Sequence, residues 1–217
     1  MNAPVGGRAD EAQPWFGAQP VDLRPDPFPV GFPVVAIIAS AGGVEALLRV
    51  LEPLPEDLPA AVLVALHQFP HRVNELARVL GRRTRLPLTL AEPDALMRPG
   101  TVLVVPPGRH LIVTSRARIG LIETGALPPP RPSGDLLLAT LAVTCGPRAL
   151  AVVLTGGGHD AQAGVRAVVH CGGTVLAQDE DTSKVFAMPA AAISTGKVSQ
   201  ILAVDDIAAA IVAHTTR

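Results

Sequence analysis

The sequence predicts an α/β fold in which a doubly wound, mostly parallel sheet carries helices on both faces. Short runs rich in Val, Ile, Leu and Ala are almost uninterrupted by polar residues, which is typical of strands buried on both faces. Helix-like stretches alternate with these runs, as they do in βαβ units. The chain has 217 residues, of which 48% are hydrophobic and 17% charged, a composition that favours one compact domain with a buried core.

The apolar runs and the stretches between them give the expected elements in chain order. We expect strands near residues 34–39, 61–66, 101–105, 149–154, 174–177 and 200–204. We expect helices near residues 43–51, 72–82, 133–145, 160–170, 187–195 and 205–215. A Ser or Asp at a helix start accepts hydrogen bonds from free backbone N–H groups. Ser133 or Asp135 is therefore expected to begin one helix, and Asp205 or Asp206 to cap the last.

Residues 86–125 interrupt this alternation. They hold several short strand-like runs separated by Pro and Gly turns, and they leave little room for a helix. We therefore expect a small antiparallel β insertion near 86–125. Residues 126–132, "ALPPPRP", are expected to form a stiff connector to the next helix.

The first 32 residues differ in composition from the rest of the chain. They are rich in Pro, Gly and charged residues, which disfavours a packed helix or a central strand. We expect a Pro-rich flexible tail over residues 1–32, followed by one folded domain over residues 33–217.

Charge and hydropathy exclude several classes of partner. The formal net charge is -1 and the basic residues are scattered, so we expect no nucleic-acid partner. No apolar segment reaches the roughly 18 residues that cross a bilayer, and the N-terminus lacks a signal pattern, so we expect a cytoplasmic protein without membrane insertion. Cys145 and Cys171 show neither CxxC nor metal-ligand spacing, and we interpret both as buried structural thiols. No metal site is expected.

Three polar residues follow the ends of predicted strands. Ser40 follows the first strand, His67 follows the second, and Asp160 comes after the glycine-rich loop behind the 149–154 strand. In open parallel sheets, ligands bind outside the carboxyl ends of the strands. These three side chains are therefore candidates for one site.

The same three residue types can activate a serine. A serine hydroxyl becomes a nucleophile when an imidazole takes its proton, and an acidic group orients that imidazole. Ala41, Gly42 and Gly43 permit a tight turn that leaves the Ser40 hydroxyl open to substrate. The next helix begins here and offers backbone N–H groups to a developing negative charge.

Each of these residues also has a structural interpretation. Ser40 before Gly-Gly fits a helix N-cap or a phosphate-binding turn, His67 fits a strand-end histidine bonded to backbone, and Asp160 fits the cap of the 160–170 helix. The turn lacks the GxGxxG pattern of dinucleotide-binding folds, and it lacks the GxSxG pattern and Ser…Asp…His order of α/β-hydrolases. Only the three residues together favour a Ser-His-Asp hydrolase.

A series of short motifs, in order along the chain, resembles the catalytic domain of the chemotaxis protein-glutamate methylesterases, the CheB type. The family has Ser-Thr-Gly-Gly after its first strand, a Gln-His strand end, and the motifs APGxRH, RPSVD and LTGMGNDGAAG. The matching segments here are "IASAGG" at 38–43, "ALHQ" at 65–68, "VPPGRH" at 105–110, "RPSGD" at 131–135, "LTGGGHDAQAG" at 154–164, and "AQDE" with "VFAMP" within 177–193.

The resemblance implies that residues 33–217 form a CheB-type methylesterase catalytic domain. It makes Ser40 the nucleophile, His67 the general base and later general acid, and Asp160 the residue that orients His67. The implied reaction is hydrolysis of glutamate methyl esters on the cytoplasmic helices of chemoreceptors, or on another methylated protein, through an acyl-enzyme. Glutamine deamidation is the implied side activity, and no metal or organic cofactor is implied.

The resemblance also assigns the oxyanion and substrate loop. A backbone N–H of this loop holds the oxyanion in the family, and its position falls at Gly157, beside Gly158, with help expected from the Ser40 turn at Ala41. Arg131 is expected to contact the substrate or the scaffold, since a fixed guanidinium binds carboxylates and carbonyls.

Three positions depart from the family pattern. Ala41 replaces a threonine, Gly157 replaces a methionine, and His159 replaces an asparagine and is expected to face solvent or to make a local bond. We expect a more mobile loop at Gly157. These departures motivate a rival hypothesis, a catalytically weak or inactive CheB-like module that binds or regulates a partner. The family's receiver domain is not expected in residues 1–32, so an attached receiver is not expected to control the activity.

The remaining candidates are interpreted as structural. His110 is expected to be a turn or packing histidine, and His71 to flank the 72–82 helix. Met188 and Pro189 are expected to start a helix packed on the sheet. The oligomeric state stays open at this point, because the apolar surplus fits either a core or an interface.

Overall fold

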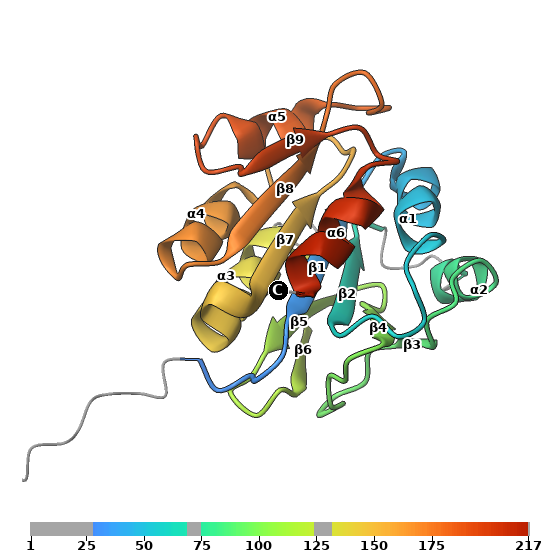
Figure 1. Cartoon of the computed structure of the whole chain (residues 1–217), viewed down its shortest axis with the longest axis vertical. Helices are drawn as coiled ribbons and strands as arrows, with labels where there is room; N and C mark the ends of the chain where they lie inside the picture. The colour runs from blue at the N-terminus through green and yellow to red at the C-terminus, as the bar shows by residue number, and fades with distance from the viewer. Residues whose placement is uncertain (1–27, 69–74, 124–131, 217) are drawn as a thin grey trace, which may run out of the picture.

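The computed structural model describes residues 28–68, 75–123 and 132–216 (Figure 1). At its centre lies a seven-stranded sheet in which every pairing is parallel. The strand order is β3-β4-β2-β1-β7-β8-β9. The strands are β1 Val34–Ala39, β2 Ala61–Leu66, β3 Leu88–Leu90, β4 Thr101–Val104, β7 Ala149–Val153, β8 Thr174–Gln178 and β9 Gln200–Leu202. The predicted parallel sheet is confirmed.

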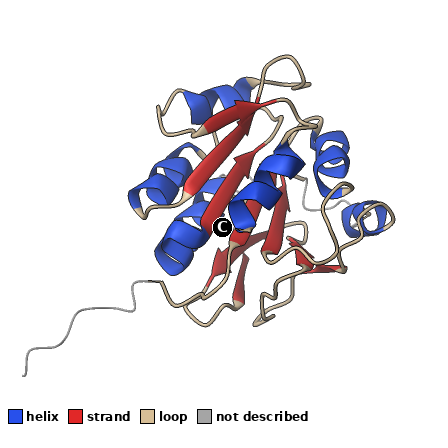
Figure 2. Ribbon diagram, viewed as in Figure 1, coloured by secondary structure: helices blue, strands red, loops and turns tan. Residues whose placement is uncertain are grey.

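Helices cover both faces of this sheet, as predicted (Figure 2). The helices are α1 Gly43–Leu51, α2 Leu76–Gly81, α3 Gly134–Cys145, α4 Gln162–His170, α5 Ala187–Ile193 and α6 Ile207–Thr215, and a short 3-10 turn, Gly146–Arg148, follows α3. No helix within the described ranges is both long enough and apolar enough to cross a membrane.

The alternation of side chains along β1 divides the core into two layers. Val34, Ala36 and Ile38 join one buried cluster with residues of α3 and α4. Val35 and Ile37 point the other way and join a second cluster with residues of α1 and α6. Successive side chains of a strand point to opposite faces, so a strand covered on both sides must be apolar throughout. This requirement explains why all of β1 is buried and uninterrupted by polar residues.

The expected antiparallel insertion is present and is smaller than the segment 86–125. A hairpin of β5, Arg109–Val113, and β6, Ile119–Glu123, forms a separate two-stranded sheet. Thr140 of α3 accepts a hydrogen bond from the Val113 N–H at 3.1 Å, which ties the hairpin to the helix layer. The earlier part of the segment instead supplies β3 and β4 to the main parallel sheet.

Two helix starts were tested by the structure with opposite results. Ser133 is the N-cap of α3, and its hydroxyl accepts from the Leu136 N–H at 3.3 Å, as predicted. The predicted acidic cap of α6 is wrong. Asp206 occupies the N-cap position but its side chain makes no capping bond, and the Asp205 carboxylate is instead bound by the Arg49 guanidinium of α1, with Nε at 2.7 Å. Ion pairing across the tertiary structure has replaced local capping.

The chain packs against the domain from its first described residues. The Val30 side chain is buried, and its N–H donates to the Thr144 carbonyl at 3.4 Å. The Arg148 guanidinium donates to the carbonyls of Phe28 and Val30. The segment 28–30 is therefore fixed at the C-terminal end of α3. The rest of the predicted tail, residues 1–27, lies outside the described residues.

Candidate active site

The candidate residues lie near the carboxyl ends of β1 and β7, where the strand order of the sheet changes direction. β1 and β7 are neighbours at the centre of the sheet, and the chain leaves them in opposite directions. The connection from β1 enters α1 on one face, and the connection from β7 enters α4 on the other face. The loops after β1 and β7 therefore separate beyond the carboxyl ends of the strands, which is where ligands of open α/β sheets bind.

Backbone hydrogen bonds fix Ser40 and His67 at this edge. The Ser40 N–H donates to the Thr155 carbonyl at 3.0 Å, and the His67 N–H donates to the Ala39 carbonyl at 3.0 Å. Both bonds continue the ladders of β1 with its neighbours beyond the last strand residues. Alternation along the strands directs the Ser40 and His67 side chains to the same face, the one covered by α3 and α4.

The His67 and Asp160 side chains meet directly. His67 Nε2 lies 2.8 Å from Asp160 Oδ2, and the exposed fractions of the two side chains are only 12% and 5%. Because Nε2 is engaged by the carboxylate, Nδ1 is the ring nitrogen left to exchange a proton with another group. The structure therefore brings His67 and Asp160 together beside the strand end that carries Ser40.

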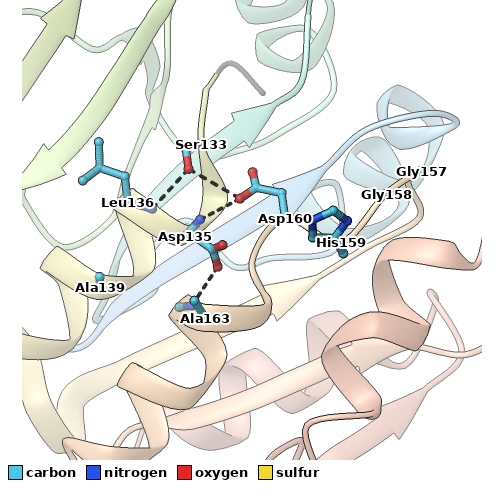
Figure 3. Close-up of a pocket in the computed structure, with 10 residues that line it drawn as sticks. Ser133, Asp135, Leu136, Ala139, Gly157, Gly158, His159, Asp160 and Ala163 are labelled. Carbon is cyan, nitrogen blue, oxygen red and sulfur yellow. Dashed lines mark hydrogen bonds between the residues drawn. The ribbon is translucent and has the colours of Figure 1, made fainter. Parts of the chain in front are cut away.

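The N-terminus of α3 holds the other side of the Asp160 carboxylate. Asp160 accepts from the Gly134 N–H at 2.5 Å. It also accepts from the Asp135 N–H at 3.0 Å, and the Ser133 hydroxyl lies 3.4 Å away (Figure 3). Burial by itself raises the pKa of Asp160, but the hydrogen bonds from His67 and from the two backbone N–H groups outweigh it. The pKa is therefore lowered from its ordinary value, and the carboxylate stays ionised.

The alternative in which Asp160 caps the 160–170 helix is wrong. The N-cap of α4 is Ala161, which has a left-handed backbone with φ of 78° and offers no side-chain acceptor. This turn directs the Asp160 carboxylate away from its own helix and toward the start of α3. The N-terminus of α4 is capped instead by Asp135, whose Oδ1 accepts from the Gly164 N–H at 2.8 Å.

Sequence reasoning did not find the partners of Asp160 at the start of α3. Ser133, Gly134 and Asp135 supply a hydroxyl and two backbone N–H groups to it. The helix-start signal in "RPSGD" was recognised, but a helix start does not reveal which distant carboxylate will occupy it.

Small residues allow the Ser40 turn to form. Gly42 has φ of 80°, and a Cβ added there would lie 2.6 Å from Cβ of Lys184. A Cβ on Gly43 would lie 2.6 Å from a Leu66 methyl group, so the start of α1 sits directly on β2. The sequence prediction that these glycines serve a tight strand-to-helix turn is confirmed, while Ala41 lies exposed at its tip.

The loop after β7 has a fixed start and an open tip. The Gly156 N–H donates to the Val185 carbonyl, and its carbonyl accepts from the Met188 N–H, both at 2.8 Å. Gly157, Gly158 and His159 are exposed. The expectation that His159 faces solvent agrees with this exposure.

An open pocket of about 600 Å³ lies beside this loop. Ser40 and His67 are not among its lining residues, so the pocket flanks the candidate triad on the Asp160 side. Its lining is formed by Ser133, Asp135, Leu136, Ala139, Gly157, Gly158, His159, Asp160, Ala163 and Gly164 (Figure 3).

Several other predicted residues have structural places. His110 is buried, and its Nδ1 accepts from the Ser133 N–H at 3.0 Å, so it is a packing histidine as predicted. Met188 is fully buried at the start of α5. Arg131 and His71 lie outside the described residues.

The two cysteines differ from each other. Cys145 is buried, and burial raises the pKa of its thiol to about 11. Cys171 is only half-buried, so the prediction of two buried thiols is wrong for this residue, which follows α4 at the domain surface. Within the described ranges, no three His, Cys, Asp or Glu side chains are grouped as metal ligands would be.

Comparison with known proteins places this architecture in a family. The sequence model described as "CheB methylesterase" matches residues 35–211. The crystal structure of the Thermotoga maritima CheB methylesterase catalytic domain superposes with a TM-score of 0.81 and 30% sequence identity, covering 85% of this chain and 99% of that one.

Curated relatives agree with the structural match. A protein-glutamate methylesterase/protein-glutamine glutaminase of Moorella thermoacetica is 40% identical over 190 residues, which are 86% of this chain and 45% of that protein. The protein-glutamate methylesterase FrzG of Myxococcus xanthus is 39% identical over 84% of this chain and 55% of its own length. This chain thus spans about half the length of the curated relatives it matches. On its fold, its strand-end residues and these matches, the chain belongs to the CheB methylesterase family.

Proposed function

We propose that this protein hydrolyses glutamate methyl esters in a protein substrate, with Ser40, His67 and Asp160 as a catalytic triad. The observation that carries the proposal is the largely buried hydrogen bond of 2.8 Å between His67 and Asp160, beside the strand end that bears Ser40. An ionised, desolvated carboxylate on one ring nitrogen prepares the other nitrogen to act as a base.

The roles of the two ring nitrogens follow from the hydrogen bond. With its proton on Nε2, His67 donates to Asp160. The Nδ1 lone pair is then left to act as the base for the Ser40 hydroxyl. Ser40 Oγ attacks the ester carbonyl while Nδ1 takes the hydroxyl proton. The resulting imidazolium is stabilised by the Asp160 carboxylate, whose pKa is held below its ordinary value first by the hydrogen bond from His67 and then by the N–H groups at the start of α3.

The tetrahedral intermediate then collapses and the alcohol leaves. Nδ1 of His67 returns its proton to the departing methoxide, which leaves as methanol and yields an acyl-enzyme on Ser40. A water molecule, deprotonated by the same Nδ1, attacks this acyl group and releases the glutamate carboxylate. With a glutamine side chain as substrate, the same steps release ammonia instead of methanol.

The oxyanion of both intermediates needs fixed donors. Among the described residues no hydrogen bond uses the backbone N–H of Gly157 or of Ala41, so both are open to substrate. Ala41 lies at the tip of the Ser40 turn, and the Ser40 N–H is bonded to Thr155, which precedes Gly157 in the loop after β7. We assign these two N–H groups to the oxyanion hole.

The proposed substrates are methylated cytoplasmic helices of chemoreceptors or another methylated protein, and the proposed location is the cytoplasm. The names of the relatives support the reaction class, because two of the most similar ones are protein-glutamate methylesterases. The rival function is a CheB-like module that binds a partner without useful turnover, favoured by Ala41 and by Gly157 at the tip of the loop.

A serine-directed reagent tests the proposal. The intact protein is treated with a fluorophosphonate and weighed by mass spectrometry, beside Ser40→Ala, His67→Ala and the control Ser199→Ala, which removes an exposed hydroxyl elsewhere. We expect a stoichiometric adduct on wild type and on Ser199→Ala, and none on Ser40→Ala or His67→Ala. Methanol release from a methylated chemoreceptor fragment then tests the substrate. A folded wild type that forms no adduct contradicts the triad and leaves the binding module.

A further inference from the structure

Asp160 and Asp135, next to the proposed catalytic residues, each accept hydrogen bonds from the N-terminus of a helix other than the one they adjoin. Asp160, which precedes α4, accepts from the backbone N–H groups of Gly134 and Asp135 at the start of α3. Asp135, in the first turn of α3, accepts from the Gly164 N–H in the first turn of α4 at 2.8 Å (Figure 3). Asp160 therefore satisfies free N–H groups of α3, and Asp135 satisfies a free N–H group of α4.

The bond from Asp135 lies beside an unfavourable backbone conformation at the start of α4. Ala161 is the N-cap there, and it holds φ of 78° although it carries a Cβ. Alanine disfavours this left-handed conformation, so it persists only where the surroundings impose it. Ala161 is also fully buried and has no side-chain acceptor. The bond from Gly164 to Asp135 supplies a side-chain acceptor that Ala161 lacks, and it ties the first turn of α4 to α3.

The same turn determines where Asp160 points. A carboxylate that caps its own helix usually belongs to the N-cap residue, whereas Asp160 lies one residue before the left-handed N-cap Ala161. The left-handed turn instead carries the Asp160 carboxylate to His67, 2.8 Å away. A shift of the start of α4 therefore also moves the backbone that carries Asp160, against the hydrogen bonds that its carboxylate makes with the start of α3.

The environment of Asp135 is unfavourable for a charge. Burial raises the pKa of Asp135, and the nearby Asp160 carboxylate raises it further, while the backbone N–H groups of Gly164 and Ala163 and the His159 side chain lower it. The net shift is upward, so the ionised carboxylate costs stability at this place.

We infer that Asp135 is a positioning residue of the active site, which holds the start of α4 and thereby keeps the Asp160 carboxylate against Nε2 of His67. This inference rests on the proposed triad but not on the identity of the ester. Asp135 acts through Asp160 and takes no part in the chemistry itself.

The experiment compares Asp135→Ala, Asp135→Asn and the control Thr84→Ala. Asparagine keeps an oxygen that can accept from the Gly164 N–H, whereas alanine removes the acceptor. Thr84 also accepts a backbone N–H, from Leu86 at 3.2 Å, but it lies in the α2 to β3 connection, in the layer opposite to the triad. Thermal unfolding verifies that each variant is folded.

Hydrolysis of p-nitrophenyl acetate separates turnover from binding. We expect kcat of Asp135→Ala to fall at least tenfold, with KM within twofold of wild type. Asp135→Asn is expected to keep at least a third of the wild-type kcat, and Thr84→Ala all of it. A wild-type kcat for Asp135→Ala, or an Asp135→Asn variant as impaired as Asp135→Ala, overturns the inference.

NMR of protein labelled with ¹⁵N-histidine reads the same geometry without turnover. The hydrogen bond to Asp160 protects the Nε2 proton of His67 from exchange, and we expect its signal in wild type and in Asp135→Asn but not in Asp135→Ala. A signal that persists unchanged in Asp135→Ala overturns the inference whatever the activity. If wild type releases no methanol from a methylated protein but shows this pattern, the inference stands and the proposed substrate is wrong.

Discussion

His67 and Asp160 lie 93 positions apart in the sequence, and their side chains share a hydrogen bond of 2.8 Å. The carboxylate is held from the opposite side by the backbone N–H groups of Gly134 and Asp135. This arrangement leaves it little freedom to rotate away from the imidazole. In the proposed mechanism the carboxylate therefore both orients the His67 ring and stabilises its positive form.

The charge of Asp160 is expected to matter more than its shape. Asp160→Asn keeps an oxygen at the start of α3 but removes the negative charge that stabilises the His67 imidazolium. We expect kcat for p-nitrophenyl acetate to fall by about 10²–10⁴, with a much smaller change in KM. Asp57→Asn, which alters an exposed acid far from the site, is the control. A kcat for Asp160→Asn within threefold of wild type would contradict the assigned role.

The stability of the protein is expected to fall in acid partly through Asp160. The native pKa of Asp160 lies below its ordinary value, so its ionisation stabilises the fold above that ordinary value. This contribution is lost as the pH falls through the native pKa. Urea unfolding of wild type and of Asp160→Asn should therefore show a larger difference at pH 7 than at pH 3. An equal difference at both values would mean that the carboxylate is not stabilised by its partners.

The contribution of Asp135 to stability is expected to change with pH in the opposite direction. Its native pKa is raised, mainly by burial and then by the Asp160 charge, so the native state binds its proton more tightly than the unfolded state does. Stability from this group is present below the ordinary pKa and is lost as the pH rises through the raised value. The free energy of unfolding of Asp135→Asn, relative to wild type, should thus increase between pH 3 and pH 7. A flat or falling difference in the urea data would refute this sign.

The glycines at the loop tip are expected to respond differently to alanine. Nothing lies within 4 Å of a Cβ added to Gly157, and its backbone is not left-handed. Gly157→Ala should therefore keep or raise stability, by about 0.4–1 kcal/mol, because it restricts the unfolded chain. Gly158 has φ of 82°, so Gly158→Ala should cost about 1–2 kcal/mol although its Cβ also meets nothing. Thermal unfolding of the two variants, which differ only in position, compares them directly, and equal effects would be inconsistent with the backbone argument.

The elements that the sequence predicted well are those whose signal is local. The apolar runs at 34–39 and 61–66 match β1 and β2 because a strand buried on both faces cannot tolerate polar residues. Ser40 and His67 were found because they directly follow such runs. Parallel strands end at one edge of the sheet, so the same local signal also placed both residues in the proposed site.

The features that escaped prediction depend on distant partners. The carboxylate of Asp205 is bound by Arg49 of a remote helix rather than used as a cap. Asp160 turns away from its own helix because Ala161 adopts a left-handed backbone that alanine disfavours on its own. No local pattern reveals either outcome, since both are imposed by the packing of elements far apart in the chain.

The pairing of β1 with β7 has a consequence for how activity is acquired during folding. It joins Val34–Ala39 to Ala149–Val153, so a long loop must close before this contact forms. Such non-local pairing slows folding, whereas helices form early from nearby residues. Ser40 directly follows β1, and Asp160 lies at the end of the loop that follows β7. During refolding, fluorophosphonate reactivity should consequently return after the helix signal in far-ultraviolet circular dichroism. The reactivity of Ser40 would then report when the central sheet has formed.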